Sequence, residues 1–256
     1  MALATGDRER RELSTGHTVS LPLELAFAVG VVVVPARRER LESVLPNPLS
    51  SLAIAPGVGC VSLVGIQYHR VGPSEPSFEP YDEFAVIVPA VRGSRTDLPF
   101  GRLADGEIGG YVHWMPVTTD ASVALGREIW GYPKERAPIT VTDGPRGVRT
   151  VVGDGDSSED AIRLEVTRPR TDVELRGVTL SSFTARDDEL TRSRMQLRGE
   201  VSIGPPVGTR LEVAPDLASE LGLWKRPLVR LTGSRVHARL FDWEPVAAPS
   251  RADSAR

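Results

Sequence analysis

Short segments with the pattern of β-strands recur along most of this chain. They alternate apolar and polar residues or are rich in β-branched residues. The segments cover residues 25–34, 60–69, 84–89, 139–142, 162–167, 173–180, 196–203 and 228–240. The chain contains 24 glycines and 21 prolines, and these residues separate the segments at short intervals. Many short strands with few helices favour an antiparallel sheet that curves or closes on itself. We therefore expect a mainly β protein of the α+β type.

A few short helices are expected between these strands. Residues 37–44 and 214–221 form two of them, and Pro215 begins the second. The third spans 121–129, where Asp120 can cap the helix by accepting backbone N–H bonds. Gly131, with a proline two residues later, ends this helix.

The chain is long enough for one domain with a full core. Its 256 residues are 40% hydrophobic. We expect residues 1–15 to be a flexible N-terminal segment, 16–246 to be the single domain and 247–256 to be a disordered tail. Residues 153–160 form an acidic loop rich in glycine and serine.

Charge and hydropathy argue against nucleic acid and membrane as partners. The net charge is −3, and the arginines are interspersed with acidic residues. The first fifteen residues lack the apolar core of a signal peptide, and the longest apolar run, residues 25–35, is too short to cross a bilayer. We expect a soluble cytoplasmic protein.

The sequence predicts neither a metal nor a dinucleotide cofactor. Its 4 histidines are far apart, and no Walker loop or nucleophile elbow is present. The single cysteine, Cys60, lies in an alternating strand pattern, so we interpret it as a buried thiol rather than a reactive one.

Lysine is rare in this chain. Only Lys134 and Lys225 are lysines, and the other 29 basic side chains are arginines. A lysine amine can lose its proton when it is desolvated and attack a carbonyl carbon, whereas a guanidinium stays charged. Lys134 follows Tyr132 and Pro133, and the proline restricts the backbone of both residues. A lone lysine is more often a solvated surface charge, so its neighbours decide between the two interpretations.

Those neighbours resemble the active-site segment of the acetoacetate decarboxylase family. The matching residues are Gly126-Arg-Glu-Ile-Trp-Gly-Tyr-Pro-Lys134, preceded by Asp120 and by Tyr111-Val-His-Trp-Met115. Three further stretches fit in order: Val44-Leu-Pro-Asn-Pro-Leu49, the strand that ends at Tyr68-His69, and Tyr81-Asp-Glu83. The resemblance covers residues 20–140, with a weaker match at 235–242. It implies a cone-like β-barrel with an internal pocket, in which Lys134 forms a Schiff base with a keto acid.

Glu83 is the second candidate catalytic residue. Strand alternation places its carboxylate on one face with Ala85 and Ile87, so an apolar wall would hold one acid. We interpret Glu83 as the group that transfers protons or orients a water, with a salt bridge at a strand end as the alternative.

The candidate substrate-binding residues follow from the same resemblance. Trp130 is expected to line the pocket, where an indole suits a bulky or flat apolar substrate. Tyr111 and Tyr132 either donate hydrogen bonds there or pack in the barrel. Arg127 either faces the ligand or braces the loop, and we favour the bracing role. His69 is also a candidate, although a histidine on a strand more often has a structural role.

Three positions differ from the family pattern. Glu135 replaces the second lysine that usually follows the reactive one, so burial rather than a like charge would have to deprotonate Lys134. Phe27 and Val64 stand where the decarboxylases carry a substrate-binding arginine and a second glutamate. Both therefore belong to the candidate substrate-binding set, as apolar residues.

Three functions remain open from the sequence. The first is a Schiff-base-forming lyase that acts on a β-keto acid or a related carbonyl compound through Lys134. The second is an aldolase-dehydratase or cyclase on the same scaffold, and the third is a non-catalytic ligand-binding barrel. The expected partner is a small carbonyl substrate, and we also expect a homo-oligomer.

Overall fold

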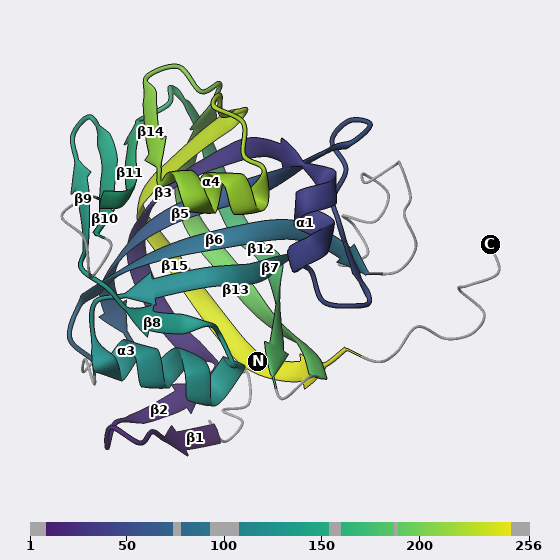
Figure 1. Cartoon of the computed structure of the whole chain (residues 1–256). Coiled ribbons are helices and arrows are strands. Elements are labelled where there is room, and N and C mark those ends of the chain that lie inside the picture. Colours follow the sequence, from purple (N-terminus) through teal and green to yellow (C-terminus); the bar gives the residue numbers. More distant parts are fainter. Residues whose placement is uncertain (1–8, 74–77, 93–107, 154–159, 187–188, 247–256) are drawn as a thin grey trace.

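The computed structural model describes residues 9–73, 78–92, 108–153, 160–186 and 189–246 (Figure 1). The expected tail at 247–256 and the central residues of the acidic loop, 154–159, lie outside the described residues.

Seven strands form a closed barrel in the order β6-β5-β3-β15-β13-β12-β7, and pairing between β6 and β7 closes the ring. Their bounds are β3 (Leu23–Arg37), β5 (Val58–Val71), β6 (Tyr81–Arg92), β7 (Ile108–Val117), β12 (Thr171–Arg186), β13 (Glu189–Gly204) and β15 (Val229–Pro245). The short strands β4 (Leu49–Ser51) and β8 (Lys134–Arg136) extend the sheet beyond the ring. The pairings in the ring are antiparallel except β7 with β12, which is parallel over two residue pairs. The expected mainly β barrel is confirmed.

A second sheet covers one side of the barrel (Figure 1). It contains β9 (Ile139–Gly144), β10 (Gly147–Gly153), β11 (Asp160–Thr167) and β14 (Thr209–Val213) in the order β14-β11-β10-β9. Glycines in the barrel wall allow close approach: a Cβ atom on Gly30 would lie 2.8 Å from Cβ of Val148. A Cβ atom on Gly65 would likewise collide with Thr150. The sequence analysis found β9 and β11 but missed β10, β14 and their assembly into a separate sheet.

All three expected helices are present, but the second part of the third one is π-helical. The helices α1 (Arg38–Val44) and α4 (Pro215–Leu221) lie side by side at one end of the barrel (Figure 1). The third expected helix divides into α3 (Asp120–Leu125) and a π-helical turn, η1 (Gly126–Trp130). Its cap is Thr119 rather than Asp120, because the Thr119 hydroxyl accepts the backbone N–H of Ser122 at 3.2 Å. Within the described ranges, none of the helices has the length and apolarity needed to cross a membrane.

Part of the N-terminal segment has regular structure. β1 (Glu9–Glu12) pairs with β2 (Thr18–Leu21), and Gly16 takes a φ of +79° in the turn between them. Leu13 is buried in this turn and joins the barrel core. The expectation of a flexible segment up to residue 15 is therefore corrected for residues 9–15, because a buried leucine and strand pairing hold them.

The core has three clusters, and strand alternation separates the two largest, an inner and an outer one. The inner cluster fills the barrel and includes Phe27, Val64 and Ala85. The outer cluster lies between the barrel wall and the second sheet and includes Leu63 and Phe84. Adjacent residues of one strand thus point to opposite sides of the wall.

Candidate active site

Lys134 is the first residue of β8, and the chain before it fixes its direction. Gly131 ends η1 in the left-handed region with a φ of +67°, which glycine adopts without a steric penalty. The amide of Tyr132 donates to the carbonyl of Gly126 at 3.1 Å, and the amide of Lys134 donates to the carbonyl of Tyr132 at 2.7 Å. The Arg127 side chain donates in turn to the carbonyl of Lys134. The lysine therefore leaves a tightly bonded turn.

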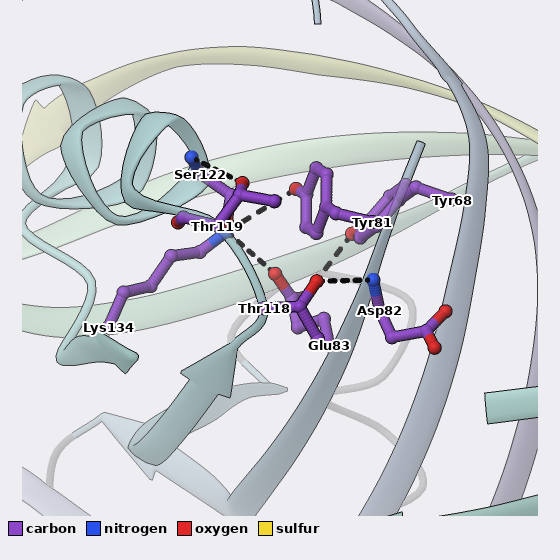
Figure 2. Close-up of polar contacts among 8 residues, drawn as sticks. All are labelled: Tyr68, Tyr81, Asp82, Glu83, Thr118, Thr119, Ser122 and Lys134. Atoms are coloured by element: carbon purple, nitrogen blue, oxygen red, sulfur yellow. Dashed lines mark hydrogen bonds and ion pairs between the residues drawn. The ribbon is translucent and has the colours of Figure 1, made fainter. Parts of the chain in front are cut away.

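The Lys134 amine contacts a buried carboxylate. Nζ of Lys134 lies 2.6 Å from Oε2 of Glu83, and the two residues are 4% and 3% exposed (Figure 2). Glu83 lies on β6 with Ala85 and Ile87 on the inner side of the barrel, as strand alternation predicted. A contact this short between two buried charges is a strong charge-assisted hydrogen bond.

Two tyrosines complete the polar cluster (Figure 2). The Tyr68 hydroxyl donates to Oε1 of Glu83 at 3.3 Å, and Nζ of Lys134 lies 3.5 Å from the Tyr81 hydroxyl. Burial, followed by the charge of Glu83, raises the pKa of both phenols well above the usual value. Both hydroxyls therefore stay protonated near neutral pH and remain hydrogen-bond donors.

The sequence analysis quoted both tyrosines but assigned neither a role. The signal was available in part, because Tyr81 stands two residues before Glu83 and so shares its face of the strand. Tyr68 lies directly opposite Tyr81 in the pairing of β5 with β6, which a sequence without a known register does not reveal.

The wall around this cluster is apolar and aromatic. Phe27 packs edge-on against Tyr68 with ring centroids 5.5 Å apart, and Val64 lies in the same inner cluster. Trp130 stacks with Tyr132 at 5.9 Å, and its indole N–H donates to the carbonyl of Phe241 at 2.8 Å. The structure thus places four of the candidate substrate-binding residues in the inner cluster: Phe27, Val64, Trp130 and Tyr132.

Tyr132 is anchored by its hydroxyl, which lies 2.8 Å from Oγ of Ser182. Burial raises its pKa to about 12. The ring therefore remains a neutral, fixed part of the wall. An internal pocket beside Lys134 stays a prediction.

Other candidate residues point elsewhere. Arg127 is exposed and bonds to the Lys134 backbone, which is the bracing alternative that the sequence favoured. Glu135 is exposed and accepts a hydrogen bond from the Trp114 indole, so it faces away from the buried amine.

His69 and Tyr111 are not brought to Lys134. His69 is exposed on β5, next to the inward Tyr68. Tyr111 precedes the inward Val112 and packs against the outer cluster. Both were candidate substrate-binding residues, and each now fits the structural alternative better, because adjacent residues of a strand face opposite sides of the wall.

Known proteins share sequence and fold with this chain. Residues 22–205 match the family described as acetoacetate decarboxylase (ADC). Acetoacetate decarboxylase 3 of Mesorhizobium japonicum is 32% identical over 115 residues, which are 44% of this chain and 37% of that protein. The match thus spans little more than a third of that relative's length.

Two solved structures share the fold. Acetoacetate decarboxylase from Legionella pneumophila has a TM-score of 0.64 at 18% identity, covering 96% of this chain and 92% of that one. The enduracididine biosynthesis enzyme MppR, complexed with the condensation product of pyruvate and imidazole 4-carboxaldehyde, has a TM-score of 0.61 at 13% identity, covering 95% and 98%. The family match extends over most of the sequence. This chain belongs to the acetoacetate decarboxylase family.

Proposed function

We propose that this protein is a lyase in which Lys134 forms a Schiff base with a small carbonyl substrate, a β-keto acid or a related compound. The observation that supports this most is the buried contact of 2.6 Å between Lys134 and Glu83 in an apolar, tyrosine-lined interior. Burying a charged pair costs free energy of solvation, so a lysine that served only as a surface charge would not be buried in this way.

The contact supplies a route to a neutral amine, which nucleophilic attack requires. A proton on Nζ can pass to Oε2 of Glu83 along the existing hydrogen bond. The transfer replaces two buried charges with two neutral groups, and apolar surroundings favour neutral groups. Tyr68 holds the carboxyl group in place from its other oxygen.

The reaction then proceeds on the carbonyl carbon. The amine nitrogen of Lys134 attacks this carbon to give a carbinolamine. Glu83 returns its proton to the oxygen, which leaves as water, and a C=N bond forms. The resulting iminium withdraws electrons, so that in a β-keto acid the bond to the carboxylate carbon breaks and CO₂ departs. Protonation of the enamine and hydrolysis release the ketone and restore Lys134.

Aldol chemistry is a second candidate, because the wall offers little to a carboxylate. Phe27 and Val64, which replace the charged residues of the family pattern, both lie in the inner cluster. A carboxylate against this apolar wall would lack a charge partner. An enamine on Lys134 could instead attack an aldehyde. The relative MppR holds a condensation product of pyruvate and an aldehyde, which supports this alternative.

Imine trapping tests the proposal. Borohydride reduction in the presence of a panel of keto acids and ketones should label Lys134, and peptide mass mapping locates the label. Lys225→Arg should trap normally, whereas Lys134→Arg keeps a positive charge beside Glu83 but cannot form an imine. Label on Lys225, or no label with any carbonyl compound, would contradict the Schiff base and favour a non-catalytic binding barrel.

A further inference from the structure

A cavity of about 240 Å³ lies on the outside of the barrel, over β3, β5, β13 and β15. Neither Lys134 nor Glu83 lines it. Six of the lining residues are polar or charged: Glu24, Arg70, Gln196, Arg198, His237 and Arg239. We call this cavity the outer arginine groove.

Strand register brings these side chains together from four strands. Ala26 of β3 is paired with Arg70 on one side and with His237 on the other, and His237 is paired with Arg198. These four residues therefore form one row across the sheet. Because Ala26 has the smallest side chain in the row, it leaves space between its larger neighbours.

A parallel row completes the groove. Glu24 is paired with Arg239, and Arg239 with Gln196. The row between these two contains Leu25 and Ala238, which are buried in the inner cluster. Since alternate rows face opposite sides, the groove lies on the reverse of the wall that encloses Lys134.

The groove has an excess of positive charge. Its lining holds three guanidinium groups, and among the described lining residues the only carboxylate is Glu24. In the part of the chain that the structure describes, no ion pair joins a carboxylate to Arg70, Arg198 or Arg239. Nε of Arg70 is buried without a hydrogen-bond partner among those residues. A buried donor of this kind costs free energy when it stays unpaired.

The neighbouring strand adds to the imbalance. Arg198 is paired with Arg176 of β12, and like charges directly opposite each other in a sheet repel. Arg176 binds Glu174 at 2.6 Å, but Arg198 has no such carboxylate among the described residues. The chain as a whole carries a net charge of −3, so this basic cluster runs against its overall composition.

We propose that the outer arginine groove binds a small multivalent oxyanion that carries phosphate or carboxylate groups. The planar guanidinium presents two parallel N–H donors that match either oxyanion. The volume, about 240 Å³, is below the range of about 300–1,000 Å³ typical of drug-sized ligands. This size suits a pyrophosphate or a tricarboxylate. The ligand would bind apart from the candidate active site, because the barrel wall separates it from Lys134.

Calorimetric titration with pyrophosphate and with citrate at low ionic strength tests this proposal without any turnover. Each anion is compared with sodium chloride of equal ionic strength. We expect saturable binding with one site per chain, weakened about tenfold or more by Arg70→Gln and by Arg198→Gln. Stronger binding of pyrophosphate would identify a phosphate ligand, and stronger binding of citrate a carboxylate ligand. Arg149→Gln, in an exposed pair with Glu165 on the second sheet, is the matched control and should bind normally.

Several results would overturn the proposal. One is the absence of saturable binding up to millimolar concentration. Another is an equal loss of anion affinity in Arg149→Gln, which would show that the anion is attracted by diffuse surface charge. A groove variant that dissociates an oligomer in light scattering, while the wild type binds no anion, would make the groove an interface between copies. Without anion, Arg198→Gln should melt at or above the wild-type temperature because it removes the repulsion from Arg176, which lies directly opposite. A large decrease would instead show that the arginine is structural.

Discussion

Replacing Gly126 by alanine should displace the Lys134 amine while leaving the barrel folded. An alanine Cβ atom at this position would lie 2.6 Å from Cε and 2.9 Å from Cγ of Lys134, and closer still to Cδ. Real side chains do not approach so closely, so the lysine chain must move. The backbone itself tolerates alanine, because Gly126 has φ −74° and ψ −43°.

The stability cost should be small. Alanine in place of glycine gains about 0.5–1 kcal/mol in a helical position, whereas overpacking a core costs about 1–3 kcal/mol. The net loss is at most about 2.5 kcal/mol, and the flexible lysine chain can reduce it. A domain of this size then melts within about 10 °C of the wild type.

The effect on imine formation should be far larger. A displacement of about 1 Å of a reacting group can lower a rate by about 10²-fold. The assay measures the rate of borohydride trapping at Lys134 and the melting temperature by circular dichroism on the same samples. Gly144→Ala is the control, since its Cβ atom would meet nothing nearer than the Gly147 carbonyl at 3.8 Å. Normal trapping in Gly126→Ala would refute the idea that this glycine positions the amine.

Four further predictions follow from the site and its supports. Glu83→Gln should shift the melting temperature by only a few degrees and lower turnover by about 10²-fold or more; a large loss of stability with unchanged turnover per folded molecule would make Glu83 structural. Acetoacetate should release CO₂ slowly compared with imine-dependent turnover of a larger keto acid or aldehyde; a kcat/KM of about 10⁴ M⁻¹s⁻¹ or more would show that its carboxylate has a charge partner despite the apolar wall. Burial raises the pKa of Cys60 from 9.0 to about 11. The thiol therefore loses its proton at lower pH in the unfolded chain than in the folded one, and the free energy of unfolding falls as pH rises from 9 to 11. In chemical denaturation, this fall should be about 2–3 kcal/mol smaller in Cys60→Ala than in the wild type. Thr119→Ala should cost about 1 kcal/mol by removing the α3 cap, and an equal or larger cost for Asp120→Ala would contradict the assignment.

Local patterns predicted those features that depend on neighbours in the chain. Strand alternation predicted that Glu83 shares a face with Ala85 and Ile87. The end of the helix before Lys134 followed from Gly131 and the proline after Tyr132. The cap was misassigned because Thr119 and Asp120 are both good capping residues, and only the backbone geometry distinguishes them. The π-helical turn at Gly126 left no recognisable mark in the sequence.

Features that depend on pairing between distant strands escaped prediction. Alternation alone does not say which face of a strand is the inner one, so His69 and Tyr111 stayed among the candidates for the pocket. The place of β14 in the second sheet was missed because this strand lies far along the chain from its partner β11. The contact of Tyr68 with Glu83 needs the register of β5 on β6, and that register is set by the whole barrel.

The strand that carries the amine lies outside the closed ring. β8 has three residues and, among the described strands, pairs with β7 alone, so it forms the edge of its sheet. Each ring strand is paired on both sides, whereas β8 is paired on one side over three residues, so its backbone pairing opens more easily. Amide hydrogen exchange should therefore be faster in β8 than in β3 or β5. An insertion of one residue in a ring strand, away from a bulge, would turn every following side chain of that strand to the other face, whereas an insertion in β8 would disturb the pairing of three residues.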